Sequence, residues 1–153
     1  MNQLSVGLAV TGSFCTFDRL LGQIEGLQQR GMDITPILSF NAAQIDTRFG
    51  KAADFQQKLT ELTGHAPLLT LTEVEPIGPK KMFDVLIVAP CTGTTLGRLA
   101  NSISDTPVTT SGFTIGKLLT VRNTCRSRLF MPYMPTAAAV PITVATTAAM
   151  MAT

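Results

Sequence analysis

The chain has 153 residues, of which 45% are hydrophobic and 14% charged, and its formal net charge is +2. This length suits one globular domain with a substantial core, and the weak charge favours neither a nucleic acid nor a membrane surface as a partner. The first residues lack a secretory signal, so we expect a cytoplasmic protein. Cys15, Cys91 and Cys125 have no disulfide or zinc-ligand spacing, so we expect reduced thiols and no metal site.

The first third of the chain predicts a strand, a helix and a second strand. Residues 4–10 form a short apolar run, which is typical of a strand buried on both faces of a parallel sheet. Apolar residues then recur at helical spacing between Thr16, a candidate N-cap, and Gly31, a candidate C-terminal cap. Residues 33–40 predict another strand, and Pro36 indicates that it lies at a sheet edge or contains a bulge.

The next segments continue this alternation. Residues 51–63 predict a helix that ends before Gly64, and residues 73–82 form a connection rich in proline and glycine. Residues 83–89 give the strongest signal for a buried strand, and residues 96–103 predict a helix. Strands and helices in alternation indicate a three-layer α/β fold with a mostly parallel sheet. We assign this domain to residues 1–128.

Three segments that follow predicted strands are rich in hydroxyl groups. They are "TGSFCT" at residues 11–16, "SFN" at residues 39–41 and "PCTGTT" at residues 90–95. Ligands of parallel α/β sheets bind at the carboxyl ends of the strands, so we expect these three loops to converge at one rim.

The residue types of these loops favour an anionic ligand. Helix N-termini present unpaired N–H groups and a partial positive charge, and Gly12 and Gly93 allow the backbone to approach a phosphate closely. Hydroxyl groups nearby add donors for a phosphorylated cofactor. The alternative is that these serines and threonines are ordinary helix caps and that the glycines serve only the turns. Neither the GxGxxG pattern of nicotinamide sites nor a GK[ST] phosphate loop is present.

Six sequence stretches carry a resemblance to a known family. They are "GLAVTGSFCTFD", "SFN", "DTRFG" at residues 46–50, "LTG" at residues 62–64, "EPIGPK" at residues 75–80 and "VLIVAPCTGTTLGRLANSISDTPVT" at residues 85–109. Together they resemble the B subunits of dipicolinate synthase, which belong to the wider flavoprotein family of FMN-binding, cysteine-decarboxylase-like folds. The resemblance covers about residues 4–110, and "DTRFG" and "EPIGPK" are its most specific parts.

The resemblance implies a Rossmann-like flavoprotein fold, a homo-oligomer and FMN as cofactor. It also implies that the partner is a nicotinamide-dependent A subunit, with which the chain oxidises dihydrodipicolinate to dipicolinate during sporulation. The family's FMN contacts fall on Gly12, Ser13, Ser39, Asn41, Pro90, Thr92, Thr94 and Thr95. Thr94 stands where related flavoproteins have an asparagine, and it lacks the second polar group of an amide.

Two further functions remain open alongside this one. The chain is either a non-catalytic assembly or activating subunit with a relic flavin pocket, or an FMN-dependent decarboxylase that acts alone. Arg48 either forms a local ion pair with Asp46 or binds a substrate carboxylate through its planar guanidinium. His65 and the thiols of Cys15 and Cys91 lack a predicted catalytic partner, so we interpret them as structural or solvated groups.

The final segment, residues 129–153, contains no charged residue. Its prolines and threonines disfavour a membrane anchor, and its small side chains offer little surface for a buried strand to pack. Our preferred hypothesis is that this tail is out of register with the family pattern through a frameshift or truncation, which would leave part of the sheet missing. Reading the other frames of the gene beyond codon 123 tests the hypothesis.

Overall fold

The computed structural model describes residues 3–115, 118–122 and 142–145. The strands in this part of the chain form one sheet in the order β2-β1-β3-β4-β5. They are β1 (Ser5–Val10), β2 (Asp33–Leu38), β3 (Val85–Cys91), β4 (Leu118–Arg122) and β5 (Ile142–Ala145). Every neighbouring pair is parallel, which confirms the predicted parallel α/β sheet.

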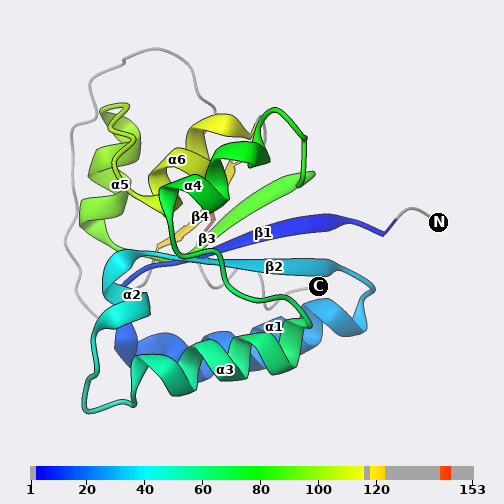
Figure 1. Cartoon of the computed structure of the whole chain (residues 1–153), viewed down its shortest axis with the longest axis vertical. Helices are drawn as coiled ribbons and strands as arrows, with labels where there is room; N and C mark the ends of the chain where they lie inside the picture. Colours follow the sequence, from blue (N-terminus) through cyan, green and yellow to red (C-terminus); the bar gives the residue numbers. More distant parts are fainter. Residues whose placement is uncertain (1–2, 116–117, 123–141, 146–153) are drawn as a thin grey trace.

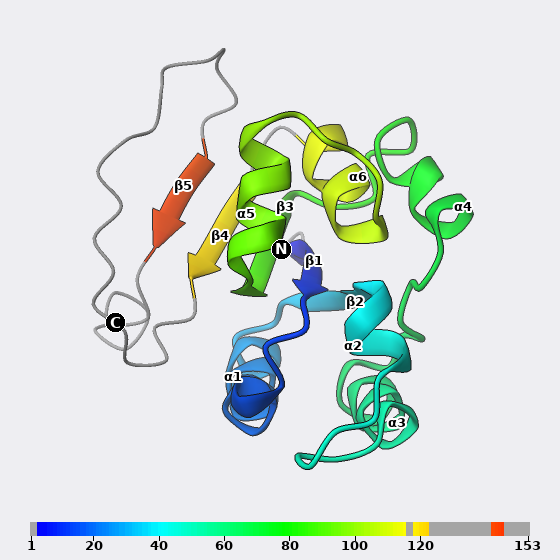
Figure 2. The same cartoon turned by 90° about the vertical axis from the view of Figure 1, so that its left-hand side faces the viewer.

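Helices cover both faces of the sheet and give the molecule three layers (Figure 1). One face carries α1 (Phe17–Gln29) and α3 (Ala52–Thr63). The opposite face carries α4 (Leu71–Val74), α5 (Gly93–Ala100) and α6 (Pro107–Thr114). The short helix α2 (Phe40–Gln44) follows the end of β2, and Figure 2 shows it above α3. The three-layer arrangement predicted from the sequence is therefore confirmed.

Side chains of the central strand β1 pack into two separate cores, one on each face of the sheet. Val6, Leu8 and Val10 join Leu59 of α3 in the first core, whereas Ala9 belongs to the second core, under α4, α5 and α6. Because both faces are covered, all residues of β1 from Val6 onward are buried. This double burial explains why the strand reads as a continuous apolar run rather than an alternating one.

Strand β2 lies at the edge of the sheet, as Pro36 indicated. Pro36 pairs in register with Leu8 of β1, and an edge strand tolerates a residue without an N–H group better than a central strand does. The carbonyl oxygen of Pro36 accepts a hydrogen bond from the N–H group of Leu68 (2.9 Å). The segment around Leu68 thus covers part of the exposed edge of β2.

Both predicted glycine stops have left-handed backbone angles. Gly64 ends α3 with φ +74°, and its N–H group donates to the carbonyl oxygen of Thr60. Gly31 follows α1 with φ +80°. Thr16 stands at the N-cap position of α1, but its hydroxyl group does not cap the helix; instead it donates to the carbonyl oxygen of Ser13 (2.8 Å).

Several short helices were missing from the sequence interpretation. The connection predicted over residues 73–82 contains the end of α4 and a 3-10 turn at Glu75–Ile77. A capping box between Thr70 and Glu73 starts α4, and a second one starts α6. The sequence of α6, "PVTTSGFT", is poor in strong helix formers, so its burial and its capped start hold it in place rather than its propensity.

The tail predicted as atypical, residues 129–153, contains the described strand β5, which pairs with β4 from Leu118 to Val121. The remainder of the tail, together with Cys125, lies outside the described residues. Within the described ranges, none of the helices has the length and apolar character needed to cross a bilayer.

Candidate functional site

The order of the strands reverses direction at β1, whose neighbours are β2 on one side and β3 on the other. Ligands of open parallel sheets bind in the crevice at such a switch point, outside the carboxyl ends of the strands. The first loop (residues 11–16) follows β1 and the third loop (residues 90–95) contains the end of β3. The second loop (residues 39–41) follows β2. The topology therefore places all three hydroxyl-rich loops at the same end of the sheet.

Thr11 joins the first loop to the third. Its side chain is buried, with 1% of its surface exposed. The hydroxyl group donates a hydrogen bond to the carbonyl oxygen of Pro90 (2.6 Å) and accepts one from the N–H group of Thr92 (3.0 Å). The N–H group of Thr11 also donates to the Pro90 oxygen (3.3 Å). One buried threonine thus sets the spacing of the two loops.

Gly12 brings the first loop against the second. A methyl group placed on Gly12 would lie 3.3 Å from Cβ of Asn41 and 3.6 Å from the ring of Phe14. Ser39 is tied to the end of β1 because its N–H group donates to the carbonyl oxygen of Val10 (3.0 Å). Its hydroxyl group accepts from the N–H group of Ala42 and caps α2. The close approach of the two loops therefore depends on the absence of a side chain at residue 12.

One of the candidate threonines, Thr92, caps α5, and a second, Thr95, contacts it. The hydroxyl group of Thr92 accepts from the N–H group of Thr95 (3.4 Å), and the two hydroxyl groups lie 3.0 Å apart. Thr95 is buried, whereas Thr94 is exposed. Among the residues that the structure describes, none beyond the chain neighbours has an atom within 4 Å of the position that a Cβ atom would take on Gly93, so these residues leave the space above this loop open. Thr92 is thus a helix cap, which was the alternative interpretation of these hydroxyl-bearing residues.

Unpaired backbone donors remain at both helix starts. Within the described part of the chain, the N–H groups of Gly12, Phe14, Cys15, Gly93 and Thr94 have no hydrogen-bond acceptor. The three loops contain no charged residue. An anion at this rim would therefore be held by backbone N–H groups, hydroxyl groups and the positive ends of two helices. This donor set fits the phosphate group of a cofactor such as FMN.

The "DTRFG" segment forms a tight turn beside this rim. Thr47 and Gly50 exchange two backbone hydrogen bonds (3.0 and 3.1 Å). The carboxylate of Asp46 accepts from the N–H group of Ala52 (2.8 Å), at the start of α3. The Arg48 guanidinium lies 4.8 Å from the centre of the Phe49 ring. The ion pairs of the described residues do not include one between Asp46 and Arg48. The first of the two interpretations of Arg48, a local ion pair with Asp46, is therefore wrong.

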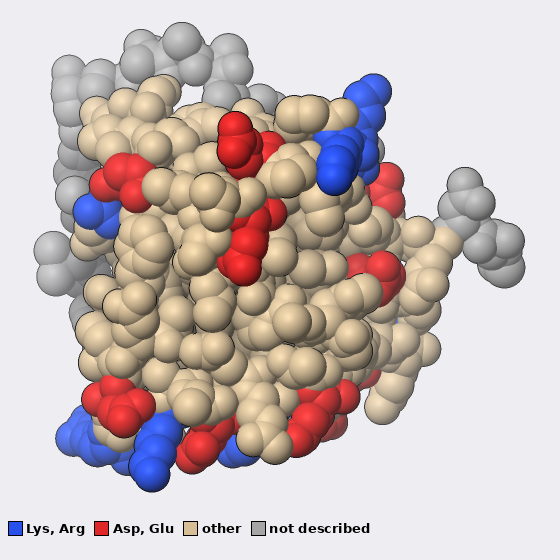
Figure 3. Space-filling model, in the orientation of Figure 1, with Lys and Arg blue, Asp and Glu red and all other residues tan. Residues whose placement is uncertain are grey.

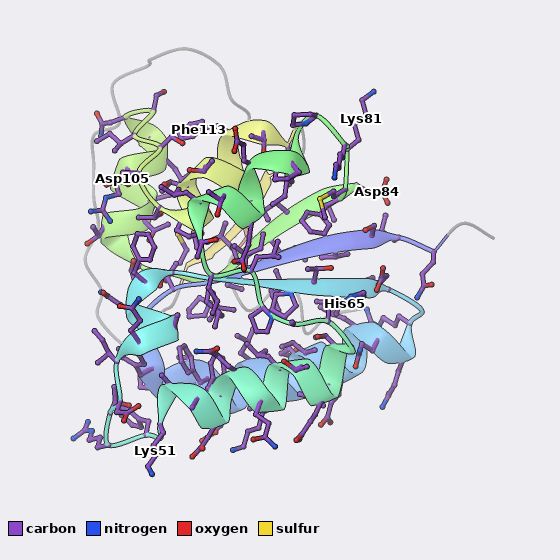
Figure 4. The ribbon with its side chains drawn as sticks, viewed as in Figure 1. Lys51, His65, Lys81, Asp84, Asp105 and Phe113 are labelled. Atoms are coloured by element: carbon purple, nitrogen blue, oxygen red, sulfur yellow. The ribbon has the colours of Figure 1, made fainter. Side chains whose placement is uncertain are left out.

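The remaining singled-out side chains lie away from a common centre. His65 pairs with Asp33 (2.8 Å between Nε2 and Oδ1) at the start of β2, and Figure 4 shows it at the opposite end of α3 from Lys51. Cys91 is buried, whereas Cys15 is exposed. The described residues contain no cluster of three or more histidine, cysteine or acidic side chains that would suit a metal ion.

Thr11 and Phe14 lie in the first predicted loop, but neither was among the predicted site residues. Thr11 follows β1 directly, and its position before Gly12 was the only available signal. Phe14 lies beside Gly12, and the centre of its ring is 5.4 Å from that of Phe17. Neither contact has a sequence signature, because each depends on loops that are far apart in the chain or on the packing of α1.

The fold and the rim define a class: a parallel α/β protein whose loops at the switch point present unpaired backbone N–H groups. The sequence model of the Flavoprotein family matches residues 1–138. The chain therefore belongs to the Flavoprotein family. This match extends beyond the resemblance that the sequence motifs alone supported, which ended near residue 110.

Two similar proteins are dipicolinate synthase B subunits. The curated B subunit of Bacillus subtilis strain 168 is 38% identical over 103 residues, which are 67% of this chain and 52% of the relative. The chain thus spans about half the length of that curated relative. The crystal structure of the B subunit from Bacillus halodurans matches with 31% identity and a TM-score of 0.66, covering 78% of this chain and 65% of that one.

More distant structures share the fold. The FMN-dependent cysteine decarboxylase TvaF from thioviridamide biosynthesis has 22% identity and a TM-score of 0.67, with coverage of 94% of this chain and 90% of that one. DmrB from Burkholderia xenovorans, solved in complex with FMN and described as a cubic protein cage, has 22% identity and a TM-score of 0.59 over 78% of this chain and 66% of that one. At this identity the likeness establishes the fold alone.

Proposed function

We propose that this chain is the flavoprotein B subunit of a dipicolinate synthase. In this function it binds FMN, forms a homo-oligomer, and acts in the cytoplasm with a nicotinamide-dependent A subunit to oxidise dihydrodipicolinate to dipicolinate during sporulation. The observation that carries the proposal is the 38% identity to the B subunit of Bacillus subtilis. The decarboxylase structures are less similar, at 21% and 22% identity.

The rim supplies groups that suit FMN. The first loop, around Gly12 and Ser13, would hold the phosphate through the unpaired backbone N–H groups of Gly12, Phe14 and Cys15, with Ser39 and Asn41 beside it. The third loop would face the rest of the cofactor through Pro90, Thr92, Thr94 and Thr95. When bound, FMN supplies reversible two-electron redox chemistry. The role of the chain's own residues is to bind the phosphate, orient the cofactor and keep the two loops at a constant spacing through Thr11.

Arg48 is the residue that we propose for substrate binding. Its side chain is exposed, and the Thr47–Gly50 turn holds it on the Phe49 ring, next to the loop that leads into α3. A guanidinium donates two parallel hydrogen bonds to a carboxylate, which suits a dicarboxylate substrate. Arg48 would position that substrate and would not itself transfer a proton, because a guanidinium stays protonated in proteins.

One observation favours the second candidate function, a non-catalytic assembly subunit. The hydroxyl groups of Thr92 and Thr95 bind each other and the helix start, and Thr94 replaces the asparagine of related flavoproteins. At this position a threonine offers a flavin ring one hydroxyl group, whereas an asparagine would offer both a donor and an acceptor on its amide. A chain with this function would activate its partner without holding flavin itself.

Two measurements separate these functions. The purified chain is titrated with FMN, and binding is followed by flavin fluorescence and visible absorbance. Dipicolinate formation is then measured by ultraviolet absorbance, using freshly generated dihydrodipicolinate, a nicotinamide cofactor and the A subunit, with and without this chain. Flavin binding together with activity that requires both chains supports the flavoprotein function. A chain that binds no FMN but still activates its partner supports the assembly function, and a chain that has no effect on dipicolinate formation contradicts both.

A further inference from the structure

A hollow of about 80 Å³ lies beside the rim, between the N-terminal parts of α1 and α3 and the segment that follows α2. Its lining is mainly apolar and includes Phe17, Leu21 and Phe55, of which Phe55 is buried and the other two are half-buried. The rings of Phe17 and Phe55 stack with their centres 4.0 Å apart and connect α1 to α3. A concave apolar lining with a few polar groups is the general form of a small-molecule site.

The volume of the hollow limits the size of its ligand. An apolar cavity of about 150 Å³ accommodates benzene, so a hollow of about 80 Å³ is too small for an aromatic ring. In proportion, it takes about three or four carbon atoms, which is the size of the side chain of valine or leucine. The hollow therefore suits a small branched aliphatic group.

Charges of both signs surround this apolar lining. Asp18, Lys51, Asp54 and Lys58 also line the hollow, and all four are exposed. The two aspartates lie in the first turns of α1 and α3, so each helix contributes one anion. None of the four side chains forms an ion pair or a hydrogen bond within the described ranges of the chain. Figure 3 shows basic and acidic residues side by side at the lower left of the molecule, and Figure 4 places Lys51 at that corner.

This set of charges selects among ligands. A dicarboxylate, such as the substrate of the proposed function, would place like charges near Asp18 and Asp54, which disfavours its binding here. A ligand with only an ammonium group would meet the same repulsion from the two lysines. A zwitterion has one ammonium and one carboxylate group, and each forms charge-assisted hydrogen bonds with the side chains of opposite sign.

We propose that the hollow binds a free α-amino acid with a small branched aliphatic side chain, such as valine or leucine. The side chain of the ligand packs on the apolar lining. Its ammonium group faces the two aspartates and its carboxylate faces the two lysines. This ligand is neither the cofactor nor the substrate of the proposed function, so the inference goes beyond that function.

The first test compares ligands by isothermal titration of the purified wild-type chain at neutral pH. Leucine is expected to bind saturably. 4-Methylpentanoate lacks only the ammonium group of leucine, 3-methylbutylamine lacks only the carboxylate, and glycine lacks the side chain. Each of these, and phenylalanine with its larger ring, is expected to bind about tenfold more weakly or worse. No saturable binding of leucine up to about 10 mM, or equal binding of any of the four other ligands, would overturn the proposal.

Two double variants then remove the charges of the hollow in pairs. Asp18→Asn with Asp54→Asn removes both anions, and Lys51→Gln with Lys58→Gln removes both cations. Each is expected to weaken leucine binding about tenfold or more, because one charge of the ligand loses its partners. All four positions are exposed, and circular dichroism checks that both variants keep the fold.

Matched controls remove the same number of charges elsewhere on the surface. Glu25→Gln with Glu75→Gln, and Lys80→Gln with Lys81→Gln, alter exposed residues that do not line the hollow. Both are expected to bind leucine like the wild type. Equal leucine affinity of a hollow variant and its matched control contradicts the proposal. FMN is left out of these titrations, so their result does not depend on the proposed function.

Discussion

The hydroxyl group of Thr11 lies 2.6 Å from the carbonyl oxygen of Pro90 and joins the loop after β1 to the loop at the end of β3. These two residues are 79 positions apart in the chain and adjacent in the switch point of the sheet. The same hydroxyl group accepts a hydrogen bond from the N–H group of Thr92, the residue that caps α5. The start of α5 is thus aligned with the first loop by one side chain.

Replacing Thr11 with valine keeps the shape of the side chain and removes both hydrogen bonds. The buried carbonyl oxygen of Pro90 then loses its shorter hydrogen bond, and the N–H group of Thr92 loses its acceptor, so we expect the free energy of unfolding to fall by about 1–3 kcal/mol. Urea denaturation measures this change. Thr94→Val is the control, because Thr94 is exposed and its hydroxyl group has no partner among the described residues. Equal stability of the two variants would contradict the bridging role.

Substitution of Gly12 by alanine tests the close approach of the first two loops. The added methyl group would lie 3.3 Å from Cβ of Asn41, so the loops must separate by a few tenths of an ångström. We expect FMN affinity to fall about tenfold, or about 1.4 kcal/mol, with a smaller loss of stability. Isothermal titration of FMN gives the affinity.

Gly22→Ala provides the matched control for this substitution. Gly22 lies inside α1, and none of the described residues outside the helix backbone comes within 4 Å of the position that its Cβ atom would take. Alanine favours helix more than glycine does, so the variant is expected to gain about 0.5–1 kcal/mol of stability and to bind FMN like the wild type. If both variants bound FMN equally well, the first loop would not be the phosphate site.

Glu73 makes the stability of the α4 region depend on pH. Hydrogen bonds from the N–H groups of Leu69 and Thr70 lower the pKa of Glu73 below its ordinary value. A group whose pKa is lower in the folded state contributes stability above its unfolded pKa, and this contribution is lost as the pH falls through the folded pKa. We therefore expect Glu73→Gln to be less stable than the wild type at neutral pH, and the difference to shrink in acid.

Urea denaturation at neutral and at acidic pH measures this effect. Glu25→Gln serves as the control, because Glu25 is an exposed residue of α1 with no hydrogen bond or ion pair among the described residues. Its stability difference from the wild type should remain near zero at both pH values. A Glu73→Gln difference that stays constant with pH would show that the carboxylate charge does not stabilise the start of α4.

Arg48→Ala tests the proposed binding of a substrate carboxylate. The side chain is exposed and contacts Phe49, and a cation–π contact at an exposed site contributes about 0.5–1 kcal/mol. We expect at most that loss of stability, but an increase of KM for dihydrodipicolinate of about tenfold or more in the two-chain assay for dipicolinate formation. Arg48→Lys keeps the charge without the planar fork, so its KM should lie between those of the other two proteins. An unchanged KM in Arg48→Ala would remove this residue from substrate binding.

Much of the fold could be predicted because its signals are local. The apolar run of β1, the helical spacing of α1 and α3 and the stops at Gly31 and Gly64 all lie within short windows of sequence. Helices α2, α4 and α6 were missed because they are short and depend on caps and tertiary burial. Thr16 takes the N-cap position that was predicted, but its hydroxyl group makes no capping bond, because it donates to Ser13 within the 3-10 turn of Phe14–Thr16.

The sequence by itself determined the α/β alternation and the presence of three hydroxyl-rich loops, since each follows from residue type and spacing. Pro36 indicated an edge position or a bulge, and the strand order decided for the edge. Only the tertiary structure decided that Thr11 joins two of these loops and that Gly12 brings two of them into contact. It also decided that the rings of Phe17 and Phe55 stack on each other and line a hollow, which charged side chains of α1 and α3 line as well. The physical reason is that such contacts join segments distant in the chain, whose separation and orientation are set by strand order and helix packing.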